Sequence, residues 1–142
     1  MDYTGVVRSS YFKVVDDEAY EAFKTHIATD NLKFWKKEDE DGSILHAFGG
    51  YSDIYGYVED YRAYMNGEEE ADYSEFMAKL SELIAEGSAC VIQNVGHEGL
   101  RYISGSVTVI TTDISYYKSM DEMTNDLLNT AGIDPRDVEL AY

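Results

Sequence analysis

Residues 73–112 read YSEFMAKLSELIAEGSACVIQNVGHEGLRYISGSVTVITT, a helical repeat followed by two stretches of strand-like alternation. In the first part, apolar side chains recur every three or four residues, which predicts a helix over 73–86. The apolar positions are Phe76, Met77, Leu80, Leu83 and Ile84. Asp72 and Glu75 fit a capping box before this helix, and Gly87 stands where it would end.

Residues 89–95 and 100–112 contain alternating, β-branched positions and are joined through GHEG, so they predict two neighbouring strands. In the stretch SVTVITT, Val107 and Val109 fall on one face of the second strand. We expect that face to pack against the helix. The expected core consists of Phe23, Ile27, Phe76, Leu80, Leu83, Ile84, Val107 and Val109.

The flanking sequence carries further helix and strand patterns. They predict a strand over 6–15, a helix over 17–29, a hairpin over 32–37 and 44–48, and helices over 57–66 and 120–131. Asp16 and Asp17 can cap the first of these helices, Asp41-Gly42 is a hairpin turn signal, and Ser119 with Glu122 makes a capping box. The order predicts one α+β domain over residues 1–142, with an antiparallel or mixed sheet of about five strands covered by three to four helices.

The net charge of −17 over 142 residues restricts the possible partners. Phosphates would be repelled, so we expect no direct binding to nucleic acid and none to an anionic membrane. A basic protein partner, a cation site or plain solubility all remain compatible with this charge. Adaptation of the proteome to salt would give the same composition.

Cysteine content and hydropathy point to a cytoplasmic protein. Cys90 is the only cysteine, so an internal disulfide cannot form, and its apolar neighbours predict a buried thiol. No apolar run approaches the roughly 20 residues that span a bilayer. The first residues, MDYTG, lack the features of a signal peptide.

The segment YSDIYGYVEDYRAYMNGEEEADYSEF, residues 51–76, holds eight carboxylates and six tyrosines, with Arg62 as its only base. If residues 53–75 formed one helix, its carboxylates would lie about 4 Å apart, close to the roughly 3.4 Å per charge of one DNA strand. Tyrosines add flat amphipathic area suited to an interface. The predicted partner-binding residues are Asp53, Tyr57, Glu59, Asp60, Tyr64, Glu68, Glu69, Glu70 and Asp72. The alternative interpretation is a solvated face with half-buried tyrosines.

Other site signals are weak. An EF-hand alignment of KKEDEDGS would need Lys37 and Phe48 as calcium ligands, and no histidine or cysteine pair has zinc spacing, so we expect no metal. No nucleophile elbow or phosphate loop is present, and we expect no catalytic residue, no cofactor and no enzyme. Arg8, or Arg101 beside Tyr102, could hold a bound anion with paired hydrogen bonds. A cross-strand ion pair is the alternative role for such an arginine.

The stretches GVVRSSYFKV (5–14) and EGLRYISGSVTVI (98–110) resemble a family of small uncharacterised acidic proteins carried by phages, plasmids and other mobile elements. The resemblance implies a context in which acidic proteins occupy host nucleases, restriction enzymes or CRISPR effectors. The leading hypothesis is therefore a non-enzymatic nucleic-acid mimic that inhibits a basic host-defence or DNA-handling protein. A small-molecule or anion-binding module using Arg101 or Arg8, and an acidic housekeeping domain, are the alternatives.

Overall fold

The computed structural model describes residues 3–139, which contain eight strands and four α-helices. The strands are β1 (Thr4–Ser9), β2 (Ile27–Thr29), β3 (Lys33–Glu38), β4 (Ile44–Gly50), β5 (Ile54–Tyr57), β6 (Cys90–Glu98), β7 (Tyr102–Ile110) and β8 (Ser115–Ser119). The helices are α1 (Asp17–Lys24), α2 (Tyr61–Met65), α3 (Tyr73–Leu83) and α4 (Met120–Thr130), followed by the 3-10 helix η1 (Pro135–Asp137). The predicted α+β class is confirmed.

Six strands form one antiparallel sheet in the order β3-β4-β1-β6-β7-β8, and β2 pairs with β5 in a separate ribbon. The first strand occupies the centre, where Val7 lies opposite Gly50 of β4 on one side and Asn94 of β6 on the other. It thereby joins the β3-β4 hairpin to the β6-β7-β8 meander. Because every neighbour in the large sheet runs antiparallel, short turns connect most of it.

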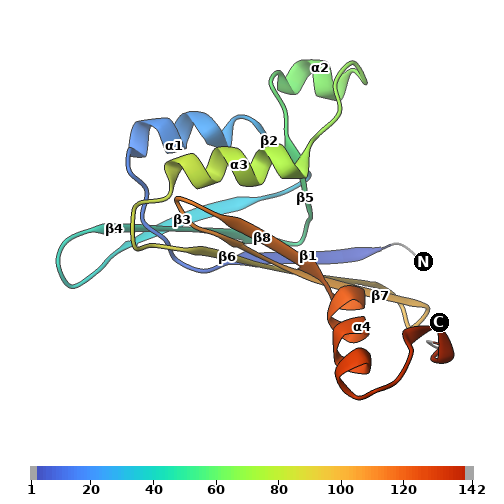
Figure 1. Cartoon of the computed structure of the whole chain (residues 1–142). Coiled ribbons are helices and arrows are strands. Elements are labelled where there is room, and N and C mark those ends of the chain that lie inside the picture. The colour runs from blue at the N-terminus through green and yellow to red at the C-terminus, as the bar shows by residue number, and fades with distance from the viewer. Residues whose placement is uncertain (1–2, 140–142) are drawn as a thin grey trace.

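Two helices, α1 and α3, lie side by side over one face of the six-stranded sheet (Figure 1). Below them, Phe76 and Leu80 of α3 are fully buried in a cluster that also contains Ile92 and Ile110 of the sheet. Phe23 of α1 completes the helix layer, with its ring centroid 5.7 Å from that of Phe76. The predicted helix stripe is therefore the centre of the core.

The predicted core face of β7 is wrong. Val107 and Val109 are only partly buried, whereas Thr108 and Ile110 face the helices. All four residues are β-branched, so alternation alone could not say which pair points inward, and a shift of one residue reverses the face. The buried hydroxyl of Thr108 is satisfied by the Tyr73 hydroxyl at 2.7 Å. The remaining expected core residues are buried or, for Leu83, partly buried.

Tertiary pairing shortens three predicted elements. The first strand ends at Ser9 rather than continuing to residue 15. The first helix ends at Lys24, because residues 27–29 pair with β5. The helix predicted over 57–66 is reduced to α2, since Tyr57 belongs to β5. Strand β8 and the ribbon β2-β5 were not predicted.

The last helix, α4, lies on the opposite side of the sheet from α1 and α3, at one end (Figure 1). Its predicted capping box is confirmed, because the Glu122 amide donates to Ser119 Oγ at 3.1 Å and the Ser119 amide donates to Glu122 Oε1 at 3.3 Å. Nevertheless, α4 has no buried residue, and Leu127 is 71% exposed. Within residues 3–139, no helix has the length and apolar character needed to cross a bilayer.

Candidate functional site

Residues 58–71 form an acidic lobe that contains α2 and projects away from the six-stranded sheet (Figure 1). Two backbone hydrogen bonds close its base: the Tyr57 amide donates to the Asp72 carbonyl at 2.9 Å, and the Asp72 amide donates to the Tyr57 carbonyl at 3.1 Å. Gly56 packs against the backbone of Asp72 at a φ of +144°, where a side chain would collide. The lobe is therefore anchored at both ends to the folded body.

Three of the predicted partner-binding carboxylates hold this region in shape. Asp60 caps the N-terminus of α2, and Asp72 caps that of α3 by accepting from the Glu75 amide at 3.1 Å. Glu69 uses both carboxylate oxygens, accepting from the Glu59 amide at 2.6 Å and the Asp60 amide at 2.9 Å. These side chains satisfy backbone donors that would otherwise be unpaired.

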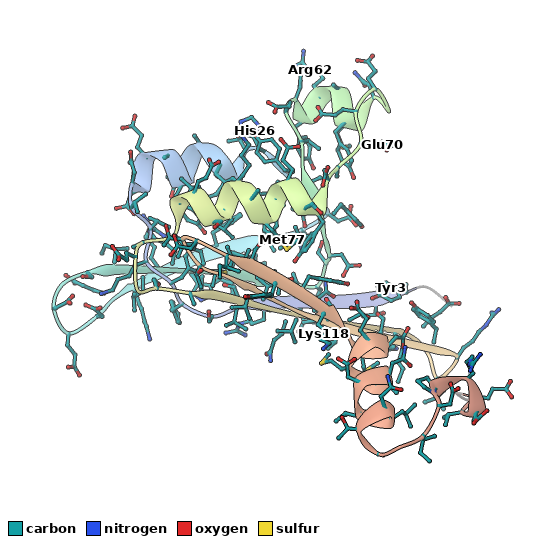
Figure 2. All side chains as sticks on the ribbon, in the orientation of Figure 1. Tyr3, His26, Arg62, Glu70, Met77 and Lys118 are labelled. Atoms are coloured by element: carbon teal, nitrogen blue, oxygen red, sulfur yellow. The ribbon has the colours of Figure 1, made fainter. Side chains whose placement is uncertain are left out.

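The other carboxylates of the lobe are available to a partner. Glu59, Glu68 and Glu70 are exposed, and the described part of the chain offers none of their side chains an ion pair or hydrogen bond. Arg62 is the single base in the lobe (Figure 2). The lobe consequently presents an excess of unpaired negative charge to solvent.

The prediction that Tyr57 is an interface anchor is wrong. Tyr57 is 8% exposed, and its ring stacks on His26, with centroids 5.1 Å apart, and on Phe23 at 6.3 Å. Burial raises the pKa of its hydroxyl. Tyr64 is half-buried and packs against Tyr61, which is exposed at the edge of the lobe. Of the two predicted aromatic anchors, only Tyr64 therefore remains, and Tyr61, which was not among them, lies beside it.

The arginines proposed for anion binding do not meet at a cavity. Arg8 lies on the sheet face away from α1 and α3, with its guanidinium 5.1 Å from the centre of the Trp35 ring. Arg101 is exposed in the turn between β6 and β7, and Tyr102 is the first residue of β7. Neither arginine lines the cavity between α3 and the sheet or the second cavity, which Leu100, Ile103 and Met120 help to line.

A cavity of about 750 Å³ lies at the foot of the lobe, between the start of α3 and the sheet. We call it the tyrosine cavity, because its lining includes Tyr3, Tyr55, Tyr73 and Tyr117 together with Asp53 and Asn94. Of these, sequence reasoning singled out only Asp53. The available signal was the run of small polar residues on one face of β6 and β7, which leaves space over the sheet.

Two observations on the described residues bear on metal and thiol chemistry. Across residues 3–139, no three side chains among His, Cys, Asp and Glu are grouped so that they could share a metal ion. Cys90 is buried in the core, and burial raises the pKa of its thiol, which disfavours the nucleophilic thiolate. His46 is also buried, with Nε2 2.7 Å from Asp17 Oδ1.

Comparison with known proteins returned no relatives. No protein-family model matches the chain, and it matches neither a curated protein nor a solved structure. The resemblance of residues 5–14 and 98–110 to mobile-element proteins stays a prediction. Function is therefore inferred from the geometry of the lobe and the cavity.

Proposed function

We propose that this chain is a non-enzymatic interaction protein that binds a basic protein through its acidic lobe. The observation that carries the proposal is the exposure of Glu59, Glu68 and Glu70, without a partner within residues 3–139, on a projecting lobe. Glu69 and the bridge between Tyr57 and Asp72 fix the backbone of this lobe before binding. Less conformational entropy is then lost when a partner docks.

The partner is a protein that handles nucleic acid, and the lobe occupies the surface that would otherwise bind phosphates. Residues 53–75 do not form a single helix with evenly spaced charges, because α2 contains five residues and Gly67 turns the chain at a φ of +77°. The carboxylates instead cluster in a compact lobe, which matches a basic patch better than a long groove. Like-charge repulsion from a net −17 disfavours acidic partners.

The reducing cytoplasm is the compartment that suits this proposal. Cys90, the single cysteine, is a buried free thiol, so the fold gains nothing from an oxidising environment. A basic protein that handles nucleic acid would be met in the same compartment. Inhibition by occupation then requires no cofactor and no chemical step.

Two matched variants test this function. The lobe variant carries Glu59→Gln, Glu68→Gln and Glu70→Gln, and leaves the structural Glu69 intact. The control variant carries Glu18→Gln, Glu82→Gln and Glu86→Gln, all exposed positions near the start of α1 and the end of α3, away from the lobe (Figure 1). Each variant removes three charges and takes the net charge from −17 to −14.

The measurement is capture of basic proteins from host lysate at low and high salt, followed by titration of the purified captured protein. The lobe variant should lose roughly 1 kcal/mol or more of its binding free energy for the captured protein. Its association should be slower and its salt dependence shallower, because charge steers the encounter. The control variant should bind within about twofold of the parent protein. Equal losses in both variants would show that only the total charge matters. The absence of any salt-sensitive captured protein would favour a role of the charge in solubility.

A further inference from the structure

The tyrosine cavity lies over short side chains of the sheet, and Asn94, Ser104 and Ser106 are among the residues that line it. On the face of the sheet that carries α3, Ile92 opposite Thr108 is followed by Asn94 opposite Ser106, and then by Gly96 opposite Ser104. Glycine and asparagine are depleted in strands, and a glycine inside a strand often marks the close approach of another group. The side chains on this face of β6 and β7 therefore become smaller with distance from the core. The resulting volume, about 750 Å³, is that of a small-molecule site.

The Tyr3 ring is fixed as one wall of this cavity. Gly96 seats the ring so closely that a Cβ at this position would collide with it. The Tyr3 hydroxyl lies 2.8 Å from Ser104 Oγ, which holds the ring against the sheet. Met77 also lines this cavity and lies below α3 (Figure 2).

Among the lining residues within 3–139, Asp53 alone carries a full charge. Its carboxylate lies over Gly5, where a Cβ would be 2.9 Å from Asp53 Oδ1 and 3.2 Å from Tyr3 Cε1. The Asp53 carbonyl accepts from Thr29 Oγ1 at 2.8 Å, which fixes the backbone. The carboxylate itself is half-buried and has no hydrogen bond or ion pair to any other residue in 3–139. A partly desolvated carboxylate without a partner is unfavourable, and a cation would relieve it.

Aromatic rings from α3 and β8 also line the cavity. Tyr73 and Tyr117 meet edge to face with their centroids 5.8 Å apart. The Tyr73 hydroxyl is held by Thr108 at 2.7 Å, so this ring has a defined orientation. Ring faces attract organic cations through their quadrupoles, an interaction that strengthens when the site is partly desolvated.

From this arrangement we propose that the tyrosine cavity binds a small organic cation, an ammonium or guanidinium group on an apolar body, with Asp53 as its counter-charge and Tyr3, Tyr73 and Tyr117 as its walls. A bound anion would face Asp53 and the field of a chain with net charge −17. A hard metal ion needs about six oxygen ligands, whereas the described part of the lining offers one carboxylate. Asp53 lies outside the acidic lobe, so this site is independent of the proposed partner surface.

The test is a titration of the whole protein with choline, butylammonium and butylguanidinium, followed by NMR at the amides of Asn94 and Ser106. The matched neutral probe is the carbon isostere of choline, in which an uncharged quaternary carbon replaces the nitrogen. We expect saturable shifts with at least one cation. The neutral isostere should bind at least about tenfold more weakly than choline. Equal binding of choline and its neutral isostere would overturn the proposal. So would the lack of saturable binding by all three cations.

Variants separate this site from the general attraction of cations to an acidic protein. Asp53→Asn should weaken binding of the strongest probe about tenfold, and Tyr3→Leu should weaken it about threefold or more. The control, Glu68→Gln with Glu70→Gln, removes more charge than Asp53→Asn but leaves the cavity intact, and should stay within about twofold. Because the Asp53 carboxylate has no partner within residues 3–139, Asp53→Asn should keep or raise the thermal midpoint. Binding by Asp53→Asn within twofold of the parent, or an equal loss in the lobe control, would refute the site.

Discussion

Leu80→Ala tests the packing of α3 on the sheet, which supports both the lobe and the cavity. Leu80 is 0% exposed and belongs to the core cluster together with Phe76, Ile84 and Ile92. The substitution removes three carbon atoms, worth about 2.4 kcal/mol at about 0.8 kcal/mol per methylene. Incomplete collapse around the new cavity adds to this, which places the expected loss at about 2–5 kcal/mol. Such a loss is a large part of the roughly 5–15 kcal/mol that stabilises a domain.

Urea unfolding followed by circular dichroism measures this loss as a lower midpoint with an unchanged slope. Leu127→Ala is the matched control, because Leu127 also lies in a helix but is 71% exposed. It should change the free energy of unfolding by no more than about 0.5 kcal/mol. A loss below about 0.5 kcal/mol for Leu80→Ala as well would show that α3 does not pack as described.

Two further predictions concern the alkaline limit of the fold and the order of the lobe. Burial raises the pKa of Tyr73 to about 12, so its contribution to stability is present below about pH 10 and is lost as the pH rises to about 12. In unfolding titrations, the free energy of unfolding should fall by about 2–3 kcal/mol from this group between about pH 10 and about pH 12, and the fall should be smaller in Tyr73→Phe. Identical pH profiles for the parent protein and Tyr73→Phe would contradict this role. Glu69→Ala removes the acceptor of two amides, so hydrogen exchange at Glu59 and Asp60 should accelerate about fivefold or more while the α3 amides are unchanged. Unchanged exchange at both residues would show that Glu69 does not hold the lobe.

Signals that are local in sequence predicted their structures correctly. Asp16, Asp72 and Ser119 cap the helices that their spacing indicated. Gly42 turns the β3-β4 hairpin at a φ of +86°, as expected for an Asp-Gly turn. In each case the stabilising hydrogen bonds or backbone angles involve residues within a few positions of one another.

Features that depend on distant segments could not be derived in the same way. Tyr57 continues the helical spacing of Val58 and Tyr61, but pairing with Ile27 turns it into a strand residue. The inward face of β7 depends on how the meander is placed under α3, and its β-branched residues fit either face. Local propensity is easily overridden in such segments.

The candidate site was predictable in composition and not in geometry. The excess of carboxylates over residues 51–76 was visible at once, but their division into structural and unpaired groups was not. Glu69 is structural because the chain returns beside Glu59, and Asp53 lines a cavity because the turn before β5 meets the start of β1. Both depend on contacts that only the folded chain supplies.

Competition with duplex DNA tests the central claim most directly. A basic protein captured by this chain should release labelled duplex DNA as the chain is added, in proportion to occupancy, because both ligands would use one surface. The lobe variant should release DNA at concentrations about fivefold higher or more, and the matched control variant at nearly parental concentrations. Simultaneous binding of DNA and this chain, or equal displacement by both variants, would contradict the account.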